Sequence, residues 1–177
     1  MTLHEAMPEY DVREYHQTII RASPEETYRA LKVTDFRGSW LVRMLLRMRA
    51  GGRAPGRVTL EQFWQSGFVM LWDEPNVEVL LGVVGKFWTP SGRRIEVTPQ
   101  QFASFDDPRY GKAAFTFQLS QHPSGTLLST ETRVRCFGRK ERILFRCYWT
   151  LIRPFSGLIR IEMLKQVRHV CERELMK

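Results

Sequence analysis

Three side chains stand out as possible acids or bases for catalysis, those of His16, Glu131 and Tyr148. Glu131 lies in an alternating segment whose neighbours Thr130 and Thr132 share a face with apolar residues, so its carboxyl group points to the opposite face. A carboxylate in that position commonly forms a cross-strand ion pair with an arginine, and we favour this interpretation over catalysis. His16 is a lone histidine in an expected strand, where a half-buried structural residue is the simpler interpretation. The residues alone therefore assign no catalytic group.

Hydroxyl and aromatic side chains offer binding chemistry instead. The chain has 11 Phe, 5 Trp and 5 Tyr, together 12% of its residues, and such residues usually fill a core. Aromatic walls that carry a few hydroxyl groups also describe a pocket for a lipophilic molecule, which the hydroxyls of Thr130, Thr132 and Tyr148 would orient. The residues that we expect to line such a pocket are Phe87, Phe102, Phe115, Phe117, Thr130, Thr132, Tyr148 and Met163.

Other kinds of site lack their sequence motifs. The chain has no GxxxxGKS or GxxxxGKT phosphate loop, no dinucleotide fingerprint and no GxSxG element. Its four histidines are scattered and its three cysteines lack CxxC spacing, so we expect neither a metal nor a cofactor. The cysteines are expected to be small buried hydrophobic residues. Ser156, which follows Pro154 by two residues, is expected to be the N-cap of a helix rather than a nucleophile.

The length and composition are those of one ordinary globular domain. The chain has 177 residues, of which 43% are hydrophobic and 26% charged, and a domain of this size buries a sizeable core without disulfides or metals. These values exclude fibrous, disordered and disulfide-framework proteins. We expect a single domain over 1–177, with a flexible N-terminus at 1–9.

The N-terminal residues and the cysteines indicate a cellular location. The first residues carry Glu5, Glu9 and Asp11 and no apolar core, which is not the pattern of a secretory signal. An odd number of cysteines fits a reducing compartment, so we expect a cytoplasmic protein. Arginines interrupt the most apolar stretch, 143–164, and we therefore expect no transmembrane segment.

Positive charge is concentrated in two parts of the chain. Residues 133–177 hold 12 of the 27 basic residues and 4 of the 19 acidic ones, which accounts for the whole net charge of +8. Residues 36–60 hold six arginines and no acidic residue. Basic surfaces of this kind suit nucleic acid or anionic lipid. The aromatic residues lie in expected strand interiors rather than beside the arginines, and no nucleic-acid motif is present, so we expect no nucleic-acid partner.

Periodicity places these residues on the elements of an α+β fold. A strand is predicted at 10–22, and Ser23, Pro24 and Glu26 form a capping box that begins a helix ending near Lys32. An amphipathic basic helix is expected at 40–48, before a Gly51-Gly52 connection. A run of strands follows, at 68–72, 77–88, 93–98, 115–119 and 126–137, with a loop or brief helical turn at 100–105. Helical stripes then predict a long C-terminal helix with a kink or short break near Pro154 that separates two helical segments, because proline removes an N–H and clashes with the preceding turn.

Four segments of the chain are similar to sequences of one known superfamily. They read IIRASPEETYRAL near the start, EVLLGVVGKFW in the strand region, LSTETRV at 128–134 and YWTLIRPFSGLIRIEML at 148–164. Together with the order of elements, they resemble the helix-grip fold of the START-like or SRPBCC superfamily. That superfamily includes polyketide cyclases, lipid-transfer domains and the birch-pollen allergen, and the segments look like a bacterial branch of it. The resemblance covers about residues 10–173.

The resemblance implies a curved antiparallel sheet wrapped round a long C-terminal helix, with a hydrophobic cavity between them. It implies a lipophilic ligand but no catalytic residue, because the superfamily shares a cavity rather than a universal catalytic set. We therefore expect a protein that binds a hydrophobic small molecule or lipid, as a monomer or homodimer. A way into the cavity is expected near the 40–48 helix and Gly51-Gly52.

Two alternatives remain open at the level of sequence. The first is a cyclase-, dehydratase- or hydrolase-type enzyme that uses the same cavity, with Glu131, His16 or Tyr148 as the acid or base. The second is arginine-mediated binding to an anionic surface, which would weaken steeply with ionic strength.

Overall fold

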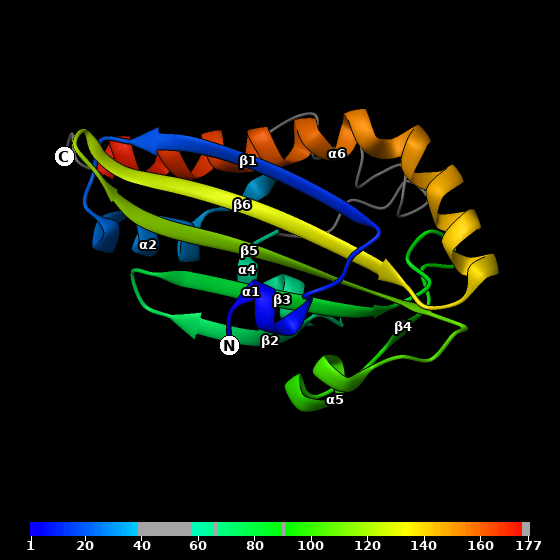
Figure 1. Ribbon diagram of the computed structural model, residues 1–177. Helices are drawn as coiled ribbons and strands as arrows, with labels where there is room; N and C mark the ends of the chain where they lie inside the picture. The colour runs from blue at the N-terminus through cyan, green and yellow to red at the C-terminus, as the bar shows by residue number, and fades with distance from the viewer. Residues whose placement is uncertain (39–57, 66, 90, 175–177) are drawn as a thin grey trace.

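The protein is a single antiparallel sheet with a long helix packed along one face (Figure 1). The structure is a computed structural model that describes residues 1–38, 58–65, 67–89 and 91–174. The helices are α1 (Leu3–Ala6), α2 (Pro24–Val33), the 3-10 turn η1 (Phe36–Gly38), α4 (Leu60–Gln65), α5 (Pro99–Ser104) and α6 (Arg139–Glu174). The strands are β1 (Val12–Ile20), β2 (Val69–Glu74), β3 (Glu78–Gly85), β4 (Arg94–Ile95), β5 (Gly111–His122) and β6 (Gly125–Cys136). This arrangement is the expected α+β helix-grip fold.

The sheet has a fixed inner and outer face because successive side chains along each strand point to opposite sides. The strand order is β1-β6-β5-β3-β2, with β4 beside β3, and every pairing is antiparallel. Phe117 pairs with Thr130 and Phe115 pairs with Thr132, so these four side chains share one face. Helices α6 and α2 cover that inner face, while α1 and α5 pack on the outer face.

The predicted helix after the first strand is confirmed. Ser23 is the N-cap of α2, its hydroxyl accepts a hydrogen bond from the Glu26 N–H, and the Glu26 carboxylate accepts one from the Ser23 N–H. Pro24 occupies the first turn, where its missing N–H costs nothing. The capping box therefore sets where the chain leaves β1 and turns under the sheet.

The main core lies between the inner face and the helices. Phe117 is fully buried, its ring stacks on that of Phe36 at 6.3 Å, and it meets Phe115 edge-on at 6.2 Å. Phe36 is held in place because its N–H donates to the Val58 carbonyl and the Asp35 carboxylate accepts from the Val58 N–H. The predicted helix at 40–48 and the Gly51-Gly52 connection, with the expected way into a cavity, lie outside the described residues.

Helix α6 shows a bend, rather than a break, near Pro154, where the sequence predicts one or the other. It is one element that contains Pro154, and Figure 1 shows it curving rather than breaking as it passes onto the sheet. A proline inside a helix removes one backbone hydrogen bond and bends the axis, and packing on either side keeps the helix going. Ser156 is therefore inside the helix, and the expectation that it is an N-cap is wrong. Among the described residues, no helix is long and apolar enough to cross a membrane.

Two further expectations are corrected. Residues 1–9, expected to be flexible, include the capped helix α1, whose Leu3 and Ala6 are buried with Met7 against the outer face. Cys147, expected to be buried, is exposed on α6, whereas Cys136 and Cys171 are buried as expected. The segment expected as a loop or brief helical turn at 100–105 is helix α5.

We predict that Phe117→Ala lowers the free energy of unfolding by about 3 to 5 kcal/mol, because it leaves a cavity among fully buried rings. Urea denaturation followed by circular dichroism measures the change. Ile19→Ala, at an exposed position of β1, is the matched control and should cost less than about 1 kcal/mol. Equal losses for the two variants would show that Phe117 is not core.

Candidate functional site

Four polar side chains meet on the inner face, on the edge strand β1 and its neighbour β6. Glu14 pairs with Thr132, and His16 pairs with Thr130, so the four occupy two neighbouring rows of the sheet. Directly opposite residues of antiparallel strands have their Cβ atoms about 4.5 to 5.5 Å apart. Phe115 and Phe117 continue the same two rows on β5. The rows thus form a polar patch, bordered by aromatic rings, that faces α6.

Helix α6 completes this patch with a direct hydrogen bond. The Ser156 hydroxyl donates to Glu14 Oε2 at 2.7 Å, and His16 Nε2 lies 3.2 Å from Glu14 Oε1. Gly157 allows the helix to come this close, because a Cβ there would lie 2.9 Å from Glu14 Oε1. The Glu14 carboxylate is therefore held on both oxygens, between a hydroxyl on the helix and an imidazole on its own strand.

Arg160 lies one helical turn beyond Ser156 and has no ionic partner among the residues that the structure describes. Its guanidinium carbon lies 4.7 Å from the centre of the Phe115 ring. Within the described part of the chain, no carboxylate reaches ion-pair distance of this guanidinium and no acceptor bonds to it. Burial lowers the pKa of Arg160 to about 10, an effect that the nearby Glu14 carboxylate opposes. Arg160 remains a cation at neutral pH, in surroundings that disfavour the charge.

Two hydroxyl groups on the same face of the sheet also lack partners among the described residues. The Oγ1 atoms of Thr130 and Thr132 are buried, and neither has a hydrogen-bond partner among the residues described. A buried polar group without a partner costs about 1 to 3 kcal/mol. Thr132 pairs across the strands with Phe115, whose ring carries the Arg160 guanidinium, so the unpaired hydroxyls and the unpaired cation belong to one region.

The order in which Ser156, Glu14 and His16 are linked by hydrogen bonds restricts the chemistry that they can perform. A serine nucleophile requires an imidazole next to its hydroxyl, with the carboxylate on the far side of the ring. Here the carboxylate of Glu14 stands between Ser156 and His16, so the histidine does not activate the serine. Glu14 is the group placed to accept a proton, and Arg160 is the group placed to bind an anion.

The structure brings together most of the predicted pocket residues. Phe115, Phe117 and Met163 belong to the core cluster between the sheet and the helices, and Thr130 and Thr132 share that face. Phe87 and Tyr148 lie in a separate cluster around Phe145, at the first turns of α6.

Phe102 is a correction, because it packs on the outer face. It is fully buried among residues of α1 and the outer side of β3, and a Cβ on Gly82 would lie 2.7 Å from its ring. A residue on that side of the sheet cannot line a space between the sheet and α6, so Phe102 is removed from the predicted pocket.

Glu131 forms the ion pair that the sequence favours. Its carboxylate accepts two hydrogen bonds from Arg13, at 2.8 and 3.0 Å, and one from Arg133 at 2.8 Å. The hydrogen bond from Arg13, helped by that from Arg133, lowers the pKa of Glu131 against the opposing effect of burial. Glu131 is therefore an ionised structural group on the outer face and not a general acid.

Sequence reasoning missed Glu14, Ser156 and Arg160. The signals were present as spacing, since Glu14 and His16 are two residues apart on a strand and Ser156 and Arg160 four apart on a helix. Each spacing places a pair on one face of its strand or helix, but neither spacing predicts that the face of the strand packs against the face of the helix. Among the described residues no group of histidine, cysteine and acidic side chains could hold a metal ion.

Comparisons with known proteins give a likeness of fold alone. No family model matches the sequence, and no curated protein matches it. Protein MLL2253 from Mesorhizobium loti is 14% identical over 92% of this chain and 98% of that chain, with a TM-score of 0.47. Protein CV1439 from Chromobacterium violaceum is 15% identical over 90% and 97% of the two chains, with a TM-score of 0.41. The Zhui aromatase/cyclase from Streptomyces sp. R1128 is 10% identical over 93% and 95%, with a TM-score of 0.32.

We predict that Gly157→Ala displaces the Glu14 carboxylate while the protein stays folded. The new methyl group would lie 2.9 Å from Glu14 Oε1, too close for both to stay in place, and the strain is offset by the higher helix propensity of alanine, about 1 kcal/mol. The chemical shifts of the His16 ring, measured by NMR, should change. Leu158→Ala, at the next and exposed position, should leave them as they are. Unchanged His16 signals in the Gly157 variant would contradict the contact.

Proposed function

We propose that the protein binds a lipophilic small molecule with an acidic group between the inner face of the sheet and α6. The observation that carries this proposal is that the Arg160 guanidinium lies over Phe115, on the face that holds the Thr130 and Thr132 hydroxyls, and that all three groups lack polar partners among the described residues. A carboxylate on the ligand would give the guanidinium an ion pair and accept hydrogen bonds from the hydroxyls. The chemical class is therefore an amphiphile, such as a fatty acid or an acidic polyketide.

The rest of the inner face supports the apolar part of this ligand. Phe115 lies against Arg160, and Phe117 and Met163 continue the same apolar cluster away from the polar patch. A molecule with its acidic group at Arg160 would thus lay its hydrocarbon part along aromatic and aliphatic side chains. Such a division into a few polar groups and an apolar wall is typical of small-molecule sites.

A second candidate function is acid–base catalysis on the same ligand. The observation that favours it is Glu14, whose carboxylate is fixed by Ser156 and His16 and neighbours the Arg160 charge. In this reading Glu14 would take a proton from a substrate whose acidic or carbonyl group Arg160 holds. The variant Glu14→Gln separates the two functions, since it would abolish turnover of a bound substrate and leave binding through Arg160 in place.

We predict that acidic amphiphiles stabilise the protein and that their uncharged analogues do not. A fatty acid and the alcohol of the same chain length form a matched pair, to be tested by thermal shift beside isoprenoids and aromatic polyketides. A ligand at a hundred times its dissociation constant stabilises a protein by about 2.7 kcal/mol. A shift with the acid alone supports the proposal, whereas equal shifts with both, or none with any ligand, would contradict it.

We also predict that Arg160→Met stabilises the ligand-free protein and removes the response to acidic ligands. The substitution keeps the apolar contact with Phe115 and removes a charge without an ionic partner, a change that is commonly stabilising. We expect the melting temperature to rise by about 2 to 4 °C, which corresponds to about 1 kcal/mol in a chain of this size. Differential scanning calorimetry measures the change.

The control for this variant is Arg168→Met. Arg168 lies on the same helix, but it is exposed and its Nε donates to Glu172 at 2.8 Å. Exposed ion pairs contribute little, so this variant should change neither the melting temperature nor the ligand response appreciably. A destabilised Arg160→Met protein that still responds to the acid would show that Arg160 has a structural role.

A further inference from the structure

The two ring nitrogens of His16 have different surroundings. Nε2 lies 3.2 Å from Glu14 Oε1. A carboxylate only accepts hydrogen bonds, so the hydrogen of the neutral ring lies on Nε2, and Nδ1 keeps the lone pair. No group among the described residues donates to Nδ1, and the His16 side chain is 25% exposed, so water reaches the ring. Nδ1 is therefore a nitrogen that can take up a proton from solvent.

The elements that pack most closely on β1 are β6 and α6, and they present few charges to this ring. On β6 the residue opposite His16 is Thr130, whose hydroxyl is uncharged. On α6 Gly157 comes close, since a Cβ there would lie 3.5 Å from His16 Nε2. The charged residues within about one turn of Gly157 are Arg153, which is exposed, and Arg160. The positive charge of Arg160 opposes protonation of the ring until an anion neutralises it.

The charges around the site balance before a ligand binds. Arg160 carries one positive charge, and Glu14, whose side chain is only 12% exposed, carries one negative charge close enough to favour it. A ligand carboxylate at Arg160 adds a second negative charge to these partly buried surroundings. Like charges that share a site oppose each other, and a charge removed from water needs a partner. Binding therefore leaves one negative charge without a counterpart among the described residues.

We propose that His16 takes up a proton when an acidic ligand binds, so that the ligand binds more tightly as the pH falls. The inference rests on the proposed function, because the ligand carboxylate supplies the charge to be balanced. The proton passes from water to Nδ1, and the imidazolium then balances Glu14 while Arg160 balances the ligand. An imidazole is suited to this role, because it gains or loses a proton between about pH 5 and 8, where carboxylates and guanidinium groups ordinarily keep their charges.

The direction of the pH dependence follows from the charge of the ligand. A bound anion favours the imidazolium, so the complex keeps the His16 proton up to a higher pH than the free protein does. At a pH where both forms are protonated the affinity is constant and high, and at a pH where neither is protonated it is constant and low. Between these limits the affinity falls by up to about tenfold for each pH unit, as the uptake of one proton requires.

Isothermal titration calorimetry with laurate tests the inference. Titrations at one pH in phosphate and in Tris, whose ionisation enthalpies differ, give the number of protons taken up on binding. The uptake should approach about one proton per laurate within the histidine range, and the affinity should fall at least about tenfold between pH 6 and pH 8. Binding without proton uptake would overturn the inference and leave the proposed function standing. Absence of binding to any acid at either pH would overturn both.

Two variants should respond in opposite directions. His16→Gln keeps a hydrogen-bond donor for Glu14 but takes up no proton, so laurate should bind at every pH with the low affinity that the native protein shows at high pH. Glu14→Gln removes the charge that needs balancing, so laurate should bind at every pH with the high affinity and without proton uptake. Proton uptake that persists in His16→Gln would place the proton on Glu14 or on the ligand and overturn the inference.

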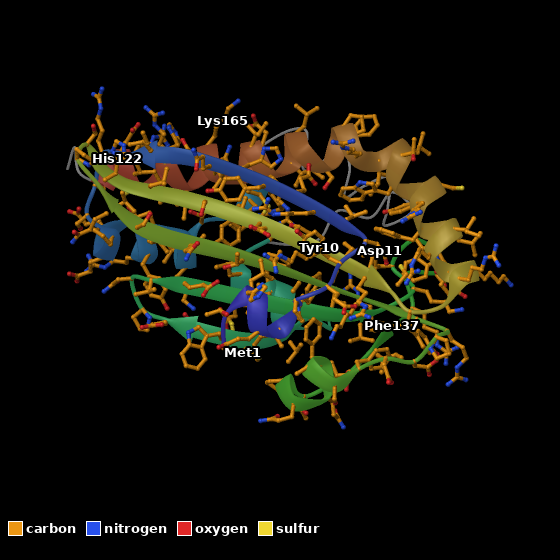
Figure 2. All side chains as sticks on the ribbon, viewed as in Figure 1. Met1, Tyr10, Asp11, His122, Phe137 and Lys165 are labelled. Atoms are coloured by element: carbon orange, nitrogen blue, oxygen red, sulfur yellow. The ribbon has the colours of Figure 1, made fainter. Side chains whose placement is uncertain are left out.

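The control for both variants is His169→Gln. His169 is an exposed histidine on α6, one turn after Lys165, which Figure 2 shows on the outside of the helix, away from the sheet. This variant should keep the proton uptake and the pH dependence of the native protein. Loss of proton uptake in His169→Gln would place the linked proton outside the site and contradict the inference.

Discussion

The antiparallel register of β6 between β1 and β5 is the constraint on which the site depends. It sets Glu14 beside Thr132 and His16 beside Thr130, with Phe115 and Phe117 completing the rows. Strand side chains alternate, so a slip of β6 by one residue would turn Thr130 and Thr132 to the outer face and bring Glu131 inside. The buried Leu128 and Val134 of β6 oppose that slip, because it would also turn them to the outer face. The apolar core therefore fixes the position of the polar site.

Local patterns in the sequence were sufficient to predict features that depend on a single strand or helix. The alternation of 126–137 correctly separates Thr130 and Thr132 from Glu131, because strand side chains alternate with a period of two residues. The capping box at Ser23 likewise gives the start of α2. Phe102 could not be placed in this way, since its side of the sheet depends on where α5 folds back against Gly82.

The difference between local patterns and long-range packing also explains why a break at Pro154 and an N-cap at Ser156 were expected on α6. The rule that proline ends a helix describes an isolated segment, in which losing a hydrogen bond is decisive. In the folded protein, residues on both sides of Pro154 pack against the sheet, and the helix bends while Ser156 bonds to Glu14. A serine and an arginine four residues apart are common on helices. Only their position over the inner face of the sheet gives Ser156 and Arg160 a common site, and that position is a long-range property of the fold.

The strongest argument for a function is the contrast between arginines on the two faces. On the outer face Arg13 and Arg133 share the carboxylate of Glu131, and at the surface Arg109 bonds to Asp107. A fold that supplies carboxylates to these arginines leaves Arg160 without one among the described residues, over a face of the sheet that also holds two unpaired hydroxyls. Replacing such groups with apolar residues would usually stabilise a protein, so stability alone does not explain why they are there. The proposed acidic ligand would complete them.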